Sequence, residues 1–518
     1  MIMIANPPRG PTAKHMASRP NFLILMADQL AASALPAYGN RVVKTPHIDG
    51  LAERGVVFQS AYCNSPLCAP SRFAFMTGRL PSAIGAYDNA AELPAHIPTF
   101  AHYLRHAGYQ TTLSGKMHFC GPDQLHGFER RLTSDIYPAD FGWTPDWLNF
   151  TERPSWYHNM DSVTKAGACV RTNQMDFDDE VIFQSQRHLF DIARGNDNRP
   201  FCLVVSMTHP HDPYAIPAEY WNRYDEAQIE MPRVQIRPED LDPHSRRLRH
   251  VCGMDAQPVS SAQIRAARRA YYGAVSYVDD QIGKMMRALK DARLDENTIV
   301  ILLADHGEML GERGLWYKMS FFEPSARVPL LVHAPKHIAA GTVGASVSTI
   351  DLLPTLVELA SEGKAPQYAS ELDGRSLLPH LERRGGHDEV FAEYLAEGAI
   401  APIVMIRRGP HKFVHCPADP DQLYDLRGDP DELDNRAAAD ATLAAQFRAE
   451  VARRWSLESL HGEVLASQHQ RRLVAAALQQ GQLTPWDFQP HFDASQQYVR
   501  NHKTLDEIEA AARFPRVP

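Results

Sequence analysis

The chain has 518 residues, of which 44% are hydrophobic and 22% are charged, and its formal net charge is -9. A chain of this size and composition can bury the core of a globular enzyme of two or three domains. The acidic balance argues against a nucleic-acid partner and mainly favours solubility.

The N-terminal segment, residues 1–20, is polar and Pro-rich and lacks the apolar segment of a signal peptide. The first hydrophobic run, residues 22–26, is far too short to span a bilayer. The seven cysteines are odd in number and scattered, so free thiols in a reducing compartment fit better than disulfides. We therefore expect a cytoplasmic protein with no membrane partner, in which Met16 is an alternative start.

Short apolar runs and helix-like segments alternate along the first three quarters of the chain. Four runs predict buried parallel strands: residues 21–27, 110–114, 201–207 and 298–304. The two clearest helical segments are residues 97–107 and 262–293. This alternation predicts an α/β fold, with a large, mixed but mostly parallel sheet between layers of helices.

The C-terminal part has a different pattern. Residues 404–409 and 411–414 resemble a hairpin, residues 422–426 a third strand, and a helix over 436–466 would cover this small sheet. Residues 222–261 are rich in charge and Pro and predict a long surface excursion. We expect four parts: a disordered extension (1–19), a catalytic domain (20–384), a small antiparallel-sheet subdomain (385–466) and a tail (467–518).

Polar side chains follow each of the four predicted parallel strands. They are Asp28, Lys116 with His118, His209 with His211 and Asp212, and Asp305 with His306. Any one of them is more simply a helix cap or a loop residue, but ligands in open α/β sheets bind beyond the carboxyl ends of the strands. Together they predict an active site in which Asp28, Asp305 and His306 hold a divalent cation, with residue 68 completing its shell.

The pentapeptide Cys68-Ala69-Pro70-Ser71-Arg72 lies between the first two strands. A helix starting at Pro70 would direct free N–H groups and its positive dipole end toward an anion. Arg72 would add a fixed positive charge there and bind the oxygens of that anion. On its own, the pentapeptide is more simply a free cysteine in a turn before a helix.

The pentapeptide resembles the modification signature of the type I sulfatases, which belong to the alkaline-phosphatase superfamily. Asp28, Lys116-Met117-His118, Pro210–Pro213, Asp305-His306-Gly307 and Lys318 follow in that family's order and spacing, over about residues 20–460. Residues 471–518 are similar to the C-terminal extension of choline sulfatases, which supports oligomer assembly and reaches toward an active site. The resemblance implies a sulfatase-like fold and a homo-oligomer, a dimer or tetramer, assembled through the tail.

The resemblance also implies a role for each residue of the site. A formylglycine-generating enzyme would convert Cys68 to formylglycine, whose hydrate attacks sulfur. His118 would then remove a proton from the second hydroxyl and expel sulfate. His211 and Lys318 would assist the leaving group, with His209 as the alternative to His211. The implied catalytic set is Cys68, Arg72, Lys116, His118, His211 and Lys318, and the implied metal ligands are Asp28, Cys68, Asp305 and His306.

Two positions depart from the commonest sulfatase pattern. Many members have consecutive acids after the first strand, where this chain has Asp28 and then Gln29. Many have Asp-Asn after the fourth strand, where this chain has Asp305 and His306. This variant resembles choline sulfatases and phosphonate monoester hydrolases. Calcium is the first expectation for the metal and manganese the second.

The expected substrate is choline-O-sulfate, whose quaternary ammonium group requires aromatic faces and acidic groups. The candidates for this pocket are Asn89, Trp143, Glu393 and Asp506, with Glu397 as the alternative to Glu393. Two other functions stay open. One is an arylsulfatase or a phosphonate or phosphate ester hydrolase of the same fold, and the other is a non-catalytic protein that binds choline-like osmolytes.

Overall fold

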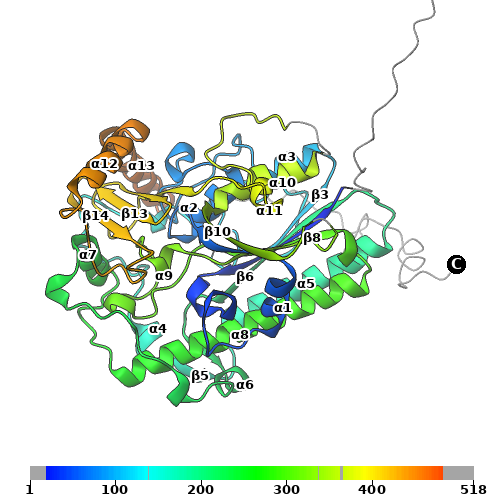
Figure 1. The fold of residues 1–518 in the computed structure, drawn as a ribbon, viewed down its shortest axis with the longest axis horizontal. Coiled ribbons are helices and arrows are strands. Elements are labelled where there is room, and N and C mark those ends of the chain that lie inside the picture. The colour runs from blue at the N-terminus through cyan, green and yellow to red at the C-terminus, as the bar shows by residue number, and fades with distance from the viewer. Residues whose placement is uncertain (1–18, 138, 337, 362–365, 482–518) are drawn as a thin grey trace, which may run out of the picture.

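The structure, a computed structural model, describes residues 19–137, 139–336, 338–361 and 366–481. A large twisted sheet runs through the middle of the molecule with helices on both faces, and a small sheet packs beside it (Figure 1). Among the described residues, no helix is long and apolar enough to cross a membrane.

The large sheet has eight strands in the order β10-β2-β9-β8-β1-β6-β3-β4. Only β9 runs antiparallel to its neighbours, so the sheet is mixed but mostly parallel, as predicted. Its strands are β1 (Asn21–Asp28), β2 (Val56–Tyr62), β3 (Gln110–Gly115), β4 (Arg130–Arg131), β6 (Phe201–Pro210), β8 (Thr298–Ala304), β9 (Leu330–His333) and β10 (Gly341–Ser348). A separate two-stranded pair joins β5 (Gly167–Cys169) and β7 (Ala215–Pro217).

The register of the central strands brings the predicted site residues to one edge. Strand β1 pairs in parallel with β8 on one side and with β6 on the other. Ala27 pairs with Ala304, so the next residues along the chain, Asp28 and Asp305, emerge side by side. This adjacency follows from parallel pairing and fixes the location of the site.

Helices cover both faces of the large sheet (Figure 1). Helices α1 (Pro46–Arg54), α5 (Asn173–Arg194) and α8 (Ser261–Asp291) lie on one face, and α2 (Cys68–Thr77), α3 (Phe100–His106) and α10 (Leu352–Ala360) lie on the other. The shorter α-helices are α4 (Asp161–Thr164), α6 (Ala218–Trp221), α7 (Pro243–Val251), α9 (Glu323–Ala326) and α11 (Leu378–Leu381). The 3-10 helices are η1 (Ala32–Ala34), η2 (Pro36–Tyr38), η3 (Pro81–Ile84), η4 (Phe141–Trp143), η5 (Glu226–Gln228), η6 (Pro238–Asp240), η7 (Asp295–Asn297), η8 (Glu312–Gly314) and η9 (Thr349–Asp351).

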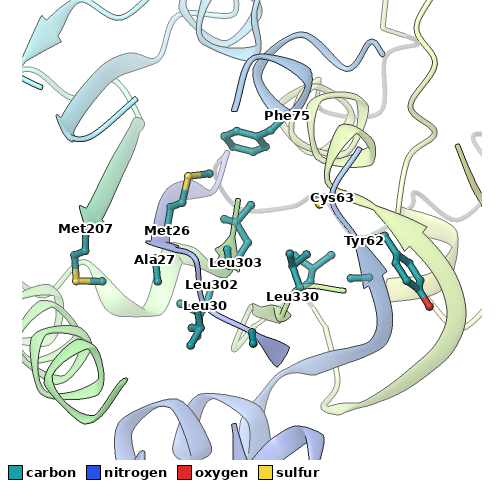
Figure 2. Packing of buried hydrophobic residues seen from close by; sticks show 14 of the residues in the cluster. Met26, Ala27, Leu30, Tyr62, Cys63, Phe75, Met207, Leu302, Leu303 and Leu330 are labelled. Atoms are coloured by element: carbon teal, nitrogen blue, oxygen red, sulfur yellow. The ribbon is translucent and has the colours of Figure 1, made fainter. Parts of the chain in front are cut away.

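The main core lies on both faces of the central strands. Figure 2 shows Phe75 of α2 beside Met26 of β1, and Leu302 and Leu303 on the neighbouring β8. Strands β1, β6 and β8 are buried along their whole length, which is why they appear in the sequence as continuous apolar runs rather than alternating ones.

The small sheet is antiparallel in the order β11-β12-β13-β14 and has a core of its own. Its strands are β11 (Glu389–Tyr394), β12 (Ile403–Arg408), β13 (His411–Cys416) and β14 (Asp419–Asp425). The single helix predicted over 436–466 is two helices, α12 (Ala441–Arg454) and α13 (Leu457–Leu478), because Trp455 is extended and buried between them. Helix α13 continues past residue 466, where the sequence predicted the tail to begin.

The charged segment 222–261 is packed rather than purely a surface excursion. It contains α7 and two 3-10 helices, and eight of its hydrophobic side chains are buried: Tyr224, Ile229, Val234, Leu241, Leu248, Val251, Cys252 and Met254. The prediction overlooked them because charged residues outnumber them locally, although each apolar side chain still reaches the core.

Candidate active site

Four potential metal ligands meet at the carboxyl ends of β1 and β8. Asp28, Cys68, Asp305 and His306 are all buried, and their ligand atoms lie within 4.8 Å of one another. The Nδ1 atom of His306 lies 3.0 Å from the Gly307 carbonyl, so it carries the proton and Nε2 presents a lone pair to the cluster. Two carboxylates and one imidazole nitrogen fit a divalent cation.

Arg72 fixes the two carboxylates of this cluster. Its Nη2 donates to Asp28 Oδ2 at 2.8 Å, and its Nε donates to Asp305 Oδ2 at 2.8 Å. Its Nη1 donates to the Lys116 carbonyl and to Ser206 Oγ. The sequence predicted that Arg72 binds the anion, whereas in the structure its three nitrogens orient the acids and the neighbouring strands.

Cys68 is the first residue of α2, two residues before the predicted start at Pro70. Its Sγ lies 3.6 Å from Lys116 Nζ and 3.3 Å from His306 Nε2. Burial alone would raise the pKa of the Cys68 thiol, but the positive charges of Lys116 and Lys318 outweigh it and hold this pKa well below its usual value. The position therefore favours an anionic group at residue 68.

Lys116 contacts both Asp28 and Cys68. Its Nζ forms an ion pair with Asp28 Oδ2 at 2.5 Å and lies 4.7 Å from the centre of the Tyr137 ring. Burial and the Cys68 thiolate would raise the pKa of Asp28, but Lys116 and Arg72 together hold it well below its usual value. Tyr137 had no signal in the sequence beyond being an aromatic residue in a loop.

His211 and Lys318 form a hydrogen-bonded pair at the site. The His211 Nδ1 lies 2.8 Å from the Asp212 carbonyl and carries the proton, so Nε2 accepts from Lys318 Nζ at 3.0 Å. Lys318 also donates to Gln29 Oε1 at 2.6 Å. The alternative residue, His209, lies with its Nδ1 2.7 Å from Asp178 Oδ2, so its ring is already engaged away from Lys318.

His118 is buried in a turn with a left-handed backbone conformation. The Asp135 carboxylate holds this turn, since its Oδ2 accepts from the backbone nitrogens of Met117 and His118. Within the described residues, neither ring nitrogen of His118 has a hydrogen-bond partner. A buried imidazole with both nitrogens unpartnered is suited to exchange a proton with a bound substrate.

Two of the residues predicted to bind the ammonium group of the substrate, Asn89 and Trp143, lie next to α2 and His118. Asn89 accepts a hydrogen bond from the Ala69 backbone nitrogen at 3.0 Å, at the first turn of α2. Trp143, in η4, is half-buried, and its ring packs edge-on against His118 with 5.7 Å between centres. An aromatic face thus adjoins the proposed proton acceptor.

Glu393 does not lie at the site. Its carboxylate accepts from the Ser82 backbone nitrogen and hydroxyl, both at 2.7 Å, and from Trp455 Nε1 at 2.6 Å, so it joins β11 to η3 and to the link between α12 and α13. These bonds explain why this acid is tolerated in the small subdomain's interface. Asp506, the fourth predicted pocket residue, lies outside the described residues.

Glu397, the alternative to Glu393, has the properties that Glu393 lacks. It is buried, and its Oε2 has no hydrogen-bond partner among the described residues. Burial, reinforced by the nearby Asp88, raises the pKa of Glu397 to about 7, and the charges of Lys318 and Cys68 act on it as well. A buried carboxylate with an unpartnered oxygen, within electrostatic reach of the site, is a candidate for binding a cationic group.

Helix α13 contacts the loops that surround this pocket. Arg471 pairs with Asp88, and the side chain of Gln468 accepts from the Trp147 backbone nitrogen at 3.1 Å. Trp147 Nε1 in turn donates to the Ala396 carbonyl, next to Glu397, at 3.0 Å. The C-terminal helix therefore fixes the segments that carry Asn89, Trp143 and Glu397.

Comparison with known proteins agrees with this arrangement. A family model described as "Sulfatase" matches residues 20–362, and one described as "Choline sulfatase enzyme C terminal" matches residues 462–514. A third, "N-sulphoglucosamine sulphohydrolase, C-terminal", matches residues 311–455.

Individual relatives show the same pattern. The chain is 46% identical to a choline-sulfatase of Rhizobium meliloti over 96% of this chain and 99% of that protein. It is 31% identical to an uncharacterized sulfatase of Escherichia coli over 80% of this chain and 83% of that protein. Its fold is similar to the crystal structure of a phosphonate monoester hydrolase of Agrobacterium radiobacter, with a TM-score of 0.68, 26% identity, and 86% of this chain and 96% of that chain covered.

Proposed function

The chain belongs to the sulfatase family, and from that premise we propose that it hydrolyses choline-O-sulfate to choline and sulfate. Two observations carry the substrate: Glu397 is a buried carboxylate with an unpartnered oxygen within electrostatic reach of Lys318 and Cys68, and the half-buried indole of Trp143 packs against His118. A quaternary ammonium cannot donate a hydrogen bond, so it needs a negative charge and an aromatic face. The similarity to a choline-sulfatase over 96% of the chain supports this substrate.

We propose that residue 68 acts in its formylglycine form, which a formylglycine-generating enzyme would produce. Its hydrate would supply the nucleophile, and a divalent cation would polarise a sulfate oxygen when bound. Asp28, Asp305 and His306 would hold that cation, and Arg72 keeps both acids in place. Calcium suits the two carboxylates, while the nitrogen of His306 leaves manganese as the second candidate.

The leaving alcohol would be protonated from the pair formed by Lys318 and His211. Of the three N–H groups on Lys318, one is donated to Gln29 Oε1 and one to His211 Nε2. Within the described part of the chain, the third has no protein acceptor, so it is free for the departing oxygen. Choline is a poor leaving group as an alkoxide, and proton donation of this kind contributes roughly a hundredfold or more to such a step.

The second half of the reaction would depend on His118. One of its two unpartnered ring nitrogens can accept the proton of the second hydroxyl on residue 68, so that the sulfated residue collapses to the aldehyde and releases sulfate. Water then has no need to attack sulfur. Lys116, close to Sγ of residue 68 and paired with Asp28, would stabilise negative charge on the nucleophile.

We also propose that the protein is a homo-oligomer assembled through its C-terminal segment. Helix α13 leaves three apolar side chains exposed near its end: Leu473, Val474 and Leu478. The match to the choline-sulfatase C-terminal model continues from this helix to residue 514. Sedimentation of the full chain and of a chain ending at residue 481 would test this assembly.

A comparison of three substrates tests the catalytic proposal. The substrates are choline-O-sulfate, its neutral isostere 3,3-dimethylbutyl sulfate, and 4-nitrophenyl sulfate, and the protein must first be shown to carry formylglycine. We expect kcat/KM for choline-O-sulfate to exceed that for the isostere by about tenfold or more, since only the cation gains from Glu397 and Trp143. Equal values for these two esters would contradict the substrate assignment.

A phosphonate or phosphate ester hydrolase is the second candidate. The fold similarity to a phosphonate monoester hydrolase and the presence of His306 among the metal-type ligands favour it. Phenyl phosphonate esters added to the same assay distinguish the two functions. A higher kcat/KM for the phosphonate ester than for choline-O-sulfate would favour this alternative.

A further inference from the structure

Glu308 is a buried acid that is linked through Gln29 to Lys318, one of the two proposed leaving-group residues. It lies in the segment after β8 and is 1% exposed. Its carboxylate contacts the side chain of Gln29, which contacts Lys318 on its other side. Gln29 thus connects Glu308 with the ammonium group of Lys318.

The hydrogen bonds give this connection a fixed polarity. Glu308 Oε1 accepts from the backbone nitrogens of Leu310 and Tyr317, at 2.9 and 2.6 Å. Its Oε2 accepts from Gln29 Nε2 in a short hydrogen bond. The Lys318 ammonium group only donates, so Gln29 Oε1 faces Lys318 and Gln29 Nε2 must be the group that points at Glu308, whose carboxylate then accepts from three donors.

The orientation of the Gln29 amide determines what Lys318 meets. With Nε2 turned to Glu308, Oε1 faces Lys318 Nζ and accepts from it at 2.6 Å. Rotation of the amide by half a turn would bring its N–H groups against an ammonium group that also only donates. Lys318 is then held where its Nζ reaches His211 Nε2 at 3.0 Å.

We propose that Glu308 is a positioning residue for the leaving-group step. It orients the Gln29 amide, and Gln29 holds Lys318 within hydrogen-bond distance of His211. This inference rests on the proposed function, because it assumes that Lys318 and His211 serve the leaving alcohol. Glu308 contacts neither substrate nor metal ligand side chains in this scheme, and its effect passes through Gln29.

An isosteric change exposes the role of the carboxylate. In Glu308→Gln, the amide oxygen must take the place of Oε1, because Leu310 and Tyr317 donate there. Its NH2 group then meets the NH2 group of Gln29, and relief of that conflict turns the Gln29 amide against Lys318. The double variant Gln29→Glu with Glu308→Gln reverses the polarity of this bond and again presents an acceptor to Lys318, with the same total charge.

The test compares an alkyl sulfate with an aryl sulfate. Choline-O-sulfate leaves as a strongly basic alkoxide that requires a proton, whereas 4-nitrophenyl sulfate leaves as a stable phenolate that does not. For Glu308→Gln we expect kcat for choline-O-sulfate to fall about ten- to a hundredfold, and kcat for 4-nitrophenyl sulfate to change by less than about threefold. Rates are divided by the formylglycine fraction of each preparation, measured by mass spectrometry.

Two controls separate this inference from the proposed function. Glu312→Gln removes an acid of the same segment whose carboxylate accepts no hydrogen bond from Gln29 and instead accepts one from the Val234 backbone nitrogen. Both substrates should therefore keep their rates. Lys318→Ala should show the same preference for the aryl ester as Glu308→Gln, only more strongly.

If Lys318→Ala lowers kcat equally for choline-O-sulfate and 4-nitrophenyl sulfate, the leaving-group role in the proposed function is wrong. If Lys318→Ala lowers kcat more for choline-O-sulfate than for 4-nitrophenyl sulfate but Glu308→Gln does not, the positioning role of Glu308 is wrong. Recovery of the choline-O-sulfate rate in the double variant, relative to Glu308→Gln, supports the orientation argument, and an equal or lower rate contradicts it.

Discussion

Arg471 and Asp88 lie 383 residues apart and form a buried bidentate ion pair, with nitrogen–oxygen distances of 2.5 and 2.7 Å. Arg471 belongs to α13, and Asp88 immediately precedes Asn89, whose side chain accepts from the backbone at the first turn of α2. The pair therefore connects the C-terminal helix to the helix that begins at Cys68. Loss of this pair should affect both stability and the substrate pocket.

We expect Arg471→Met to destabilise the fold by roughly 3–5 kcal/mol, because it leaves the Asp88 carboxylate buried without a partner. The double variant Asp88→Asn with Arg471→Met should lose less stability than Arg471→Met alone, since no charge is left unpaired. Chemical unfolding of the wild type and three variants gives the coupling energy between the two residues. A coupling energy near zero would show that α13 is held by other contacts.

Cys68→Ala should remove turnover of every sulfate ester while leaving the fold intact. The side chain is small and buried, and its replacement keeps the helix, but it removes the thiol whose proposed oxidation would convert Cβ to the aldehyde. Turnover is measured with 4-nitrophenyl sulfate, and thermal unfolding checks the fold. Substantial activity in the alanine variant would rule out the proposed nucleophile.

His118→Ala should release one equivalent of choline and then stop. Sulfur transfer to residue 68 does not require His118, but release of sulfate does, so the sulfated enzyme accumulates. Rapid-quench measurement of choline and intact-protein mass spectrometry detect the burst and the added sulfuryl group. His209→Gln is the matched control, since His209 is bound to Asp178 and should not limit sulfate release.

Glu397→Gln should lower the preference for choline-O-sulfate over its neutral isostere by roughly tenfold, because the carboxylate is the counter-charge of the ammonium group. Glu393→Gln is the matched control four residues earlier. It breaks the contacts with Ser82 and Trp455, so it should lower stability and leave the preference unchanged. A preference that changes in Glu393→Gln alone would reverse this assignment.

The pH dependence of the same residue has a definite sign. The pKa of Glu397 is raised from 4.5 to about 7, first by burial and then by Asp88, against the opposing charge of Lys318. The folded protein thus holds this proton more tightly than the unfolded chain. This contribution favours folding below about pH 4.5 and is lost as the pH rises through about 7.

Substrate binding should show the opposite trend, because only the ionised carboxylate attracts the cation. KM for choline-O-sulfate should therefore fall as the pH rises toward 7, whereas KM for 3,3-dimethylbutyl sulfate should not show this fall. Glu397→Gln should remove the difference between the two substrates. An unchanged difference in that variant would place the titrating group elsewhere.

Trp143→Ala should weaken choline recognition without abolishing catalysis. A cation–π contact contributes about 1–2 kcal/mol, so selectivity over the neutral isostere should fall roughly 5- to 30-fold. Trp221→Ala is a suitable control, since Trp221 is also half-buried but lies on α6 and packs against Arg269. Equal effects of the two substitutions would remove Trp143 from the pocket.

The sequence predicted which polar residues gather at this edge of the sheet because they lie at strand ends. Asp28 and Asp305 follow continuous apolar runs, and parallel pairing of such strands brings their ends together. The same logic located Lys116, His118 and His211. Glu308 could have been noticed in the same segment as Asp305, but nothing local shows that it faces Gln29.

The pocket was harder to predict because tertiary packing decides it. Glu393 and Glu397 are both acids near one strand, but β11 ends at Tyr394, so Glu393 is still held within the sheet region while Glu397 lies in the following loop. The Asp88–Arg471 pair joins opposite ends of the chain, and no periodicity encodes it. Helix α12 and α13 were merged because the buried Trp455 has no Gly or Pro beside it to mark a break.

The burial of Cys68 has a consequence for how the protein matures. All ten residues of α2 are buried, and residue 68 is only 2% exposed at the bottom of the site. If an enzyme oxidises this thiol, as we propose, it would have to reach the thiol before α2 packs against the sheet, because the folded protein covers it. Oxidation would then compete with folding, and the fraction of molecules that carry the modified residue would be decided before folding is complete.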